Sequence, residues 1–142
     1  MRISARNTFK GKVTALKPGA VNSEVEITTP GGDRIVAIVT NESARSLGLS
    51  VGSPASALVK ASSVLVMTAG DGVKLSARNC LPGNIAKVTH GPVSADVAIT
   101  LASGGTVHAT ITHDSATDMG LKAGVAATAV IKASSVIIAV EA

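Results

Sequence analysis

Two short segments rich in hydrogen-bond donors each occur twice in the chain. Residues 4–7 read Ser-Ala-Arg-Asn and return at 76–79, while residues 60–64 read Lys-Ala-Ser-Ser-Val and return at 132–136. The offset is 72 in both cases, from 4 to 76 and from 60 to 132, so the chain is a tandem duplication. The two copies share a set of donors most strictly, and donors in pairs suggest that the chain binds an anion.

The arginine and the lysine of these segments are the charged donors. Arg6 and Arg78 present a planar fork of N–H groups that suits oxyanions. A surface ion pair would be the usual interpretation of one such arginine, but its return within an identical tetrapeptide favours binding. Lys60 and Lys132 end a predicted strand. They are either solvated strand-end lysines or, with the serines and backbone N–H groups that follow, part of an anion-binding nest.

Hydroxyl groups are repeated at the start of a short predicted helix in each copy. Thr40 with Ser43, and Thr112 with Ser115, occupy the turn where the first helical N–H groups have no internal partner and the dipole favours negative charge. Capping of the helix and contact with a ligand are both open, and one residue can do both. With no carboxylate placed among them, these residues form a donor set suited to a fully ionised oxyanion.

The elements that would position these donors follow from periodicity and turn residues. In the first copy we predict strands at 7–16, 23–29, 34–39, 55–59 and 64–67, with a short helix at 44–47 after the third strand. The second copy repeats the elements in register at 93–100, 107–111, 112–119 and 126–140. Gly11 and Gly83 interrupt the first strand of each copy, which indicates a bulge or a close backbone approach. The order predicts a mainly β protein of two tandem OB-fold-like five-stranded barrels, each with one short helix.

Length and composition constrain the organisation. We predict domains at 1–68 and 75–142, joined by a polar, glycine-rich linker at 69–74. Units this small bury little surface alone, so we expect them to pack against each other and against other chains. No apolar run approaches the ~20 residues of a membrane helix, and the chain begins without an apolar signal-peptide core, which makes a cytoplasmic protein without membrane contact the default. Cys80, the one cysteine, is expected to be a small packing residue.

Other functional classes receive less support from the sequence. A net charge of +4 and a pI near 9.6 would suit a small OB-fold nucleic-acid-binding protein, but such proteins stack bases on aromatic side chains and Phe9 is the only aromatic residue. His90, His108 and His113 lack counterparts in the first copy and show no metal-site spacing, so no bound metal cation is predicted. Without a repeated Ser-His-Asp arrangement or a phosphate-binding loop, the chain is predicted not to be an enzyme and to carry no cofactor. Insertion of a metal into a cofactor ranks third, since no nucleophile or base can be named.

In combination, these segments resemble a known family. Ser-Ala-Arg-Asn followed by glycine, the Thr-x-x-Ser helix start before Gly-Leu, and the terminal Lys-Ala-Ser-Ser-Val are similar to the Mop domain of molybdate-binding proteins. Two such units spanning residues 3–141 resemble a di-Mop molbindin. The resemblance implies an OB-like protein that binds molybdate, and tungstate, in the cytoplasm for molybdenum storage and homeostasis. It also implies a homotrimer with oxyanions bound at interfaces.

Site residues are carried over from the family position by position. The resemblance implies that the oxyanion is bound in the first copy by Ser4, Arg6, Asn7, Thr40, Ser43, Lys60, Ala61 and Ser62, and in the second by Ser76, Arg78, Asn79, Thr112, Ser115, Lys132, Ala133 and Ser134. Candidates for further sites near a threefold axis are Gly19, Ala20 and Val21, with Gly91, Pro92 and Val93.

Overall fold

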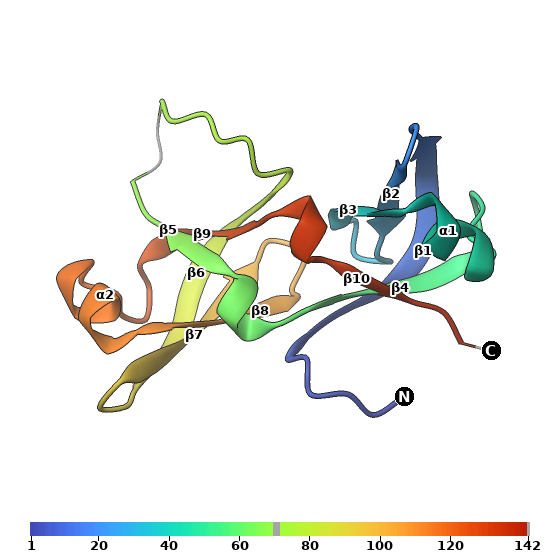
Figure 1. Ribbon diagram of the computed structural model, residues 1–142. Coiled ribbons are helices and arrows are strands. Elements are labelled where there is room, and N and C mark those ends of the chain that lie inside the picture. The colour runs from blue at the N-terminus through green and yellow to red at the C-terminus, as the bar shows by residue number, and fades with distance from the viewer. Residues whose placement is uncertain (70–71, 142) are drawn as a thin grey trace. The chain divides into compact units, whose positions relative to one another are not determined.

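The computed structural model describes residues 1–69 and 72–141, and it is built from strands with a few short helices (Figure 1). Two compact units divide the chain: residues 1–59 together with 132–142, and residues 60–131. Gly70 and Asp71, in the predicted linker, lie outside the described residues. No helix within the described ranges is long and apolar enough to cross a membrane.

The first unit is a five-stranded sheet in which all hydrogen-bonded neighbours are antiparallel, in the order β10-β4-β1-β2-β3. A six-residue helix follows β3, and a 3-10 helix precedes β10. The elements are β1 (Asn7–Pro18), β2 (Asn22–Thr28), β3 (Arg34–Thr40), α1 (Asn41–Ser46), β4 (Pro54–Val59), η2 (Ala133–Ser135) and β10 (Ile137–Ala139).

The second unit repeats this arrangement, with strand order β5-β9-β6-β7-β8. Its elements are η1 (Ala61–Ser63), β5 (Leu65–Met67), β6 (Asn79–His90), β7 (Ser94–Leu101), β8 (Thr106–Thr112), α2 (His113–Asp118) and β9 (Ala126–Ile131). Burial along β6 matches burial along β1 position for position, and burial along β9 matches that along β4. The predicted fold class, mainly β with two five-stranded units and one short α-helix in each, is confirmed.

Each unit takes its short edge strand from the other sequence repeat. The predicted strand at 64–67 was expected to complete the barrel of its own copy, but β5 pairs with β9 and β10 pairs with β4. That expected pairing is wrong. The two edge segments follow the same Lys-Ala-Ser-Ser-Val sequence, so local pattern does not distinguish which partner each will choose. The boundaries 1–68 and 75–142 stay a prediction about sequence units, and the compact units exchange their last segments.

Each sheet curls until its edges approach one another. In the first unit β3 contacts both η2 and β10, and in the second unit β8 contacts η1 and β5. The core inside each sheet is aliphatic, as the composition requires. Its most buried members include Val13, Val25, Ile27, Ile35 and Val59 in the first unit, and Val97, Ile99, Val107 and Ile131 in the second.

The glycine within the first strand of each repeat permits a close backbone approach. A Cβ at Gly11 would overlap the carbonyl oxygen of Thr28, and one at Gly83 would overlap that of Thr100. The bulge lies elsewhere, because the β1–β2 register shifts between Val13 and Ala15. Of the two predicted roles of this glycine, close approach is the one observed.

Cys80 is exposed, so its predicted role in packing is wrong. Successive side chains of a strand point to opposite faces, and Asn79 and Leu81 on either side are buried. Position 80 therefore faces outward.

Candidate functional site

The Ser-Ala-Arg-Asn segment leads into the first strand of each repeat. Strand β1 begins at Asn7, whose side chain is 1% exposed, while Arg6 immediately before it is exposed. Asn79 is likewise 1% exposed at the start of β6, and Arg78 is exposed. Each segment therefore turns its asparagine into the core and its arginine outward, and both asparagines have a bonding partner.

The lysine of the second segment follows the strand that pairs with the one this arginine precedes. The last pair of the β1–β4 ladder is Asn7 opposite Val59, and Lys60 is the next residue of the chain. Directly opposed residues of an antiparallel pair share one face of the sheet. Asn7 and Val59 point inward, and Arg6 and Lys60, each one residue beyond that pair, are both exposed. Two positive side chains thus flank the end of the ladder.

The second repeat has the same arrangement at the end of the β6–β9 ladder. Asn79 is opposite Ile131, Arg78 precedes Asn79, and Lys132 follows Ile131. Neither Lys60 nor Lys132 forms an ion pair or a side-chain hydrogen bond with another described residue. Both lysines extend from an N-cap position with β-region backbone, φ −64° for Lys60 and −67° for Lys132.

The Ala-Ser-Ser that follows each lysine forms one turn of 3-10 helix. In η1 the Ser63 N–H donates to the Lys60 carbonyl at 2.9 Å, and the Val64 N–H donates to the Ala61 carbonyl at 3.3 Å. The corresponding distances in η2 are 3.0 and 3.3 Å. The first N–H groups of such a turn, those of Ala61 and Ser62, have no partner inside it. Ser62 and Ser134 are exposed, so a hydroxyl and backbone donors lie close along the chain to each lysine.

The threonines that precede α1 and α2 cap these helices. Thr40 Oγ1 accepts a hydrogen bond from the Ser43 N–H at 3.1 Å and donates one to Ser43 Oγ at 2.9 Å. Thr112 makes the same two bonds with Ser115, at 3.1 and 2.8 Å. Capping is thus confirmed, and contact with a ligand stays a prediction. Because the threonine hydroxyl uses its proton on the serine oxygen, the serine hydroxyl proton is the one left to donate outward.

The exchange of edge segments regroups the predicted site residues. The first unit holds Ser4, Arg6, Asn7, Thr40 and Ser43 from one repeat with Lys132, Ala133 and Ser134 from the other, and the second unit holds the complementary set. The strand that ends at the cap, β3, contacts η2, and β8 contacts η1. Sequence reasoning missed this regrouping. The signal that could have raised it is the near identity of the two Lys-Ala-Ser-Ser-Val segments, which makes them interchangeable.

Comparison with known proteins identifies a domain that occurs twice in the sequence. The TOBE domain matches twice, at residues 3–66 and 75–138. The chain belongs to the TOBE-domain family. It is 44% identical over 139 residues to the molybdenum-pterin-binding protein MopA of Rhodobacter capsulatus, and 45% identical over 140 residues to the molybdenum transport protein ModE of Azotobacter vinelandii. Those matches cover 98% and 99% of this TOBE-domain protein but 52% of each relative, so the chain spans about half the length of these relatives.

Single-unit and double-unit relatives also match this TOBE-domain protein. Molybdenum-pterin-binding protein 3 of Clostridium pasteurianum is 40% identical over 67 residues, which cover 47% of this chain and 98% of that protein. A crystal structure of the cytoplasmic molybdate-binding protein ModG with molybdate bound superposes with a TM-score of 0.96 at 50% identity. That match covers 99% of this chain and all of the other. The predicted resemblance to tandem Mop-domain proteins is confirmed.

Proposed function

We propose that this protein binds molybdate, and tungstate, reversibly and without catalysis, in the cytoplasm, for molybdenum storage and homeostasis. The observation that carries the proposal is that an exposed arginine and an exposed lysine adjoin the last residue pair of each of two equivalent ladders, Arg6 and Lys60 in one and Arg78 and Lys132 in the other. Support comes from the ModG structure, which holds molybdate and matches the chain over nearly its whole length.

The chemistry of these groups suits a tetrahedral dianion. A dianion that leaves water for a protein interface needs compensating charge, because an uncompensated buried ion costs several kcal/mol. Arginine and lysine supply that charge, and hydrogen bonds from charged donors are about twice as strong as neutral ones. Hydroxyl and backbone N–H donors then fix the orientation of the four oxygen atoms. The group holds an anion and contributes no nucleophile or base toward turnover.

Distinct roles follow for the residue types of each site. The arginine and lysine supply charge, the alanine supplies its backbone N–H, and the serine and threonine hydroxyls supply neutral hydrogen bonds. The asparagine, 1% exposed, positions the strand start from within the core. The proposed residues are Ser4, Arg6, Asn7, Thr40, Ser43, Lys60, Ala61 and Ser62 for the first repeat, and Ser76, Arg78, Asn79, Thr112, Ser115, Lys132, Ala133 and Ser134 for the second.

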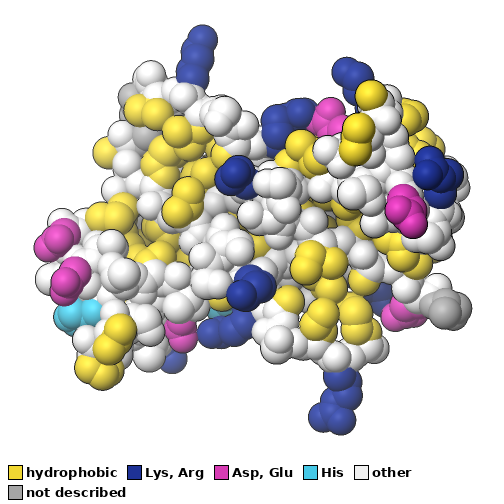
Figure 2. All heavy atoms as spheres, in the orientation of Figure 1, with side chains coloured by type: hydrophobic (Ala, Val, Ile, Leu, Met, Phe, Trp, Pro, Cys, Tyr) yellow, Lys and Arg dark blue, Asp and Glu magenta, His cyan; other side chains and the backbone are white. Residues whose placement is uncertain are grey.

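A homotrimer is the assembly that we propose for this function. Apolar side chains are exposed at equivalent positions of the two repeats: Val21 is 70% exposed and Val93 80%, Leu65 is 64% exposed and Ile137 58%. Figure 2 shows hydrophobic side chains gathered in several groups on the visible face. Exposed apolar side chains of this size can mark interaction sites, and their duplication favours self-association with repeated contacts. Val21 and Val93 also belong to the glycine turns predicted near a threefold axis.

Isothermal titration with molybdate in a sulfate-containing buffer tests the proposed function. We expect saturable heat above the sulfate background and competition between tungstate and molybdate. No heat beyond that background would contradict the proposal. A gel-shift assay at ~0.15 M salt, where purely electrostatic nucleic-acid contacts weaken steeply, should show no retained oligonucleotide.

A further inference from the structure

The two units differ in chemistry at one equivalent place, where the first residue of the α-helix meets the hairpin formed by the first two strands of the repeat. In the first unit Ser23 Oγ donates to Asn41 Oδ1 at 2.6 Å, and Asn41 Nδ2 donates to the Gly19 carbonyl at 2.8 Å. These bonds form a closed polar network. At an offset of 72 residues, the counterparts of Ser23 and Asn41 are Ala95 and His113. The second unit therefore lacks this network.

Two imidazole rings occupy that place in the second unit. His90 is the last residue of β6, at the position where the first repeat has Pro18, and His113 is the first residue of α2. Their Nδ1 atoms are 3.4 Å apart, and the rings meet edge to face with centroids 5.3 Å apart and planes at 76°. Among the described residues, neither ring forms any other hydrogen bond.

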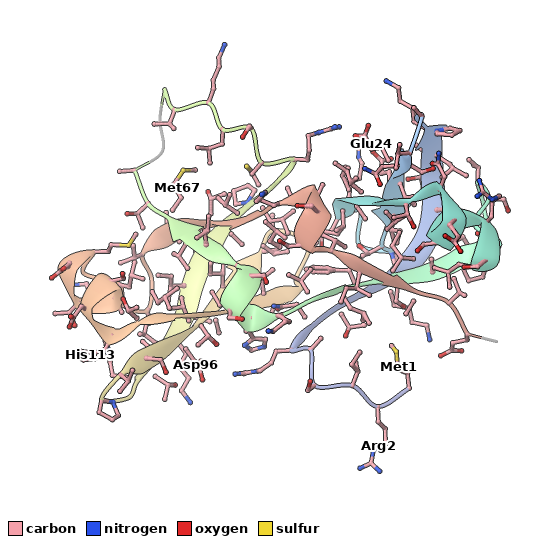
Figure 3. The ribbon with its side chains drawn as sticks, in the orientation of Figure 1. Met1, Arg2, Glu24, Met67, Asp96 and His113 are labelled. Carbon is pink, nitrogen blue, oxygen red and sulfur yellow. The ribbon has the colours of Figure 1, made fainter. Side chains whose placement is uncertain are left out.

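The backbone holds the two histidines in place. His90 is opposite Ala95 in the β6–β7 ladder, and Thr112 is opposite Ser94 in the β7–β8 ladder, so one end of β7 lies between the two segments. The His113 N–H donates to the Val93 carbonyl at 2.9 Å. Figure 3 labels His113, at the end of the unit that carries α2. The ring separation thus follows from a hydrogen-bonded framework.

We propose that His90 and His113 form a binding site for a divalent late transition-metal cation, with Zn²⁺ the best geometric match. Two nitrogen ligands at about 2.0–2.1 Å from a tetrahedral ion are about 3.3–3.4 Å apart, which is the observed Nδ1 separation of 3.4 Å. In the metal-free protein the two Nδ1 atoms share one hydrogen bond at this distance, which a bound cation would replace. Neutral imidazole is a favoured ligand of Zn²⁺, Cu²⁺ and Ni²⁺.

The surroundings are compatible with a cation. The N-terminus of α2 carries partial positive charge, which opposes a cation, but the helix has only six residues and Asp114 lies in its first turn. Three or more His, Cys, Asp or Glu side chains do not converge anywhere in the described part of the chain. The proposed ion would therefore have two protein ligands, with water completing its coordination. The site lies at the start of α2, beside Thr112 and Ser115 of the proposed oxyanion set, and it includes none of the arginines and lysines.

Zinc titration of the full chain tests the proposal, with metal-free protein and calorimetric detection. We expect one Zn²⁺ per chain for the wild type and at least tenfold weaker binding for His113→Asn. Asparagine is the residue that the first repeat has at this position, at the same place in its helix, so the variant is matched to the fold. His108→Val, which installs the first-repeat residue at the third histidine, should bind Zn²⁺ like the wild type.

Histidine NMR signals supply a second readout. On addition of Zn²⁺ the ring Hε1 signals of His90 and His113 should shift together, and that of His108 should not. The proposal is overturned if the wild type shows no Zn²⁺ binding up to millimolar concentration. Equal affinity of the wild type and His113→Asn would overturn it as well, as would a shift confined to His108.

Discussion

Paired substitutions can establish which arginine and lysine share one anion. The β1–β4 register ends with Asn7 opposite Val59, so Arg6 and Lys60 each adjoin that last pair along the chain. Membership of the compact units instead groups Arg6 with Lys132. The register is the more local restraint, because backbone hydrogen bonds set it within a few residues of both side chains. We therefore predict that Arg6→Ala and Lys60→Ala remove the same class of site, whereas Lys132→Ala removes the other.

The expected size of each effect follows from charge. Two unit charges 4 Å apart interact by about 4 kcal/mol at an effective dielectric constant of 20, and a dianion doubles this gross value. Hydration of the freed anion and the remaining cation recovers much of that energy. We therefore expect substitution of each arginine or lysine by alanine to reduce the binding free energy by more than ~1.4 kcal/mol, which is more than tenfold in affinity. Ser62→Ala and Ser134→Ala should cost less, roughly 0.5–1.5 kcal/mol for one hydroxyl hydrogen bond.

The number of molybdate ions bound per chain, measured by calorimetry, shows whether Arg6 acts with Lys60 or with Lys132. Arg6→Ala/Lys60→Ala should keep about half of the wild-type sites at wild-type affinity, because the second repeat is intact. Arg6→Ala/Lys132→Ala should keep none at that affinity. Arg2→Ala, an exposed arginine outside the repeated segments, is the matched control. The register argument is refuted if Arg6→Ala/Lys132→Ala keeps half of the sites and Arg6→Ala/Lys60→Ala keeps none. In that case the compact units define the sites.

Three further results are expected. Gly11→Ala should destabilise the protein by roughly 1–3 kcal/mol in chemical unfolding, because the added Cβ would overlap the Thr28 carbonyl oxygen. Lys10→Ala on the same strand is the control and should be neutral. Equal unfolding midpoints for the two variants would contradict the close approach. Thr112→Ala should lower the free energy of unfolding by ~1 kcal/mol because the helix cap is lost, and Thr112→Ser should restore that stability. An unaltered unfolding midpoint for the alanine variant would argue against the capping role. Sedimentation should give a trimer of the 14.0 kDa chain, and a stable monomer at micromolar concentration would refute the proposed assembly.

Much of the fold was predictable because local patterns specify it. The alternation of Val25 and Ile27 with glutamates gives a strand with a buried face, and β2 shows that pattern. The Thr40 hydroxyl followed by Ser43 predicts a helix start, and the cap is there. Gly11 predicts a bulge or a close backbone approach within a strand, and the Thr28 carbonyl supplies the close approach. In each case the determining contacts lie within one strand pair or one turn.

The features that sequence reasoning missed depend on segments far apart in the chain. The partner of each edge strand is decided by tertiary packing, because the segments that could exchange have nearly equal local sequences. Periodicity therefore predicts that β5 is a strand but does not predict which strand it pairs with. His90 and His113 are 23 residues apart and meet only because the β7 register brings both to one end of the hairpin. The burial of Asn7 was also missed, since asparagine at a strand start is usually read as a solvent-facing donor.

The molybdenum content of purified protein tests the central claim, that the duplicated donors hold an oxyanion, most directly. Protein would be equilibrated with molybdate in the presence of excess sulfate, separated by gel filtration, and analysed for molybdenum per chain by elemental analysis. The wild type and Arg2→Ala should retain molybdenum, and Arg6→Ala/Arg78→Ala should lose it while eluting at the wild-type volume. Equal molybdenum content in the double variant and the wild type would contradict the account and make the repeated Ser-Ala-Arg-Asn segments structural.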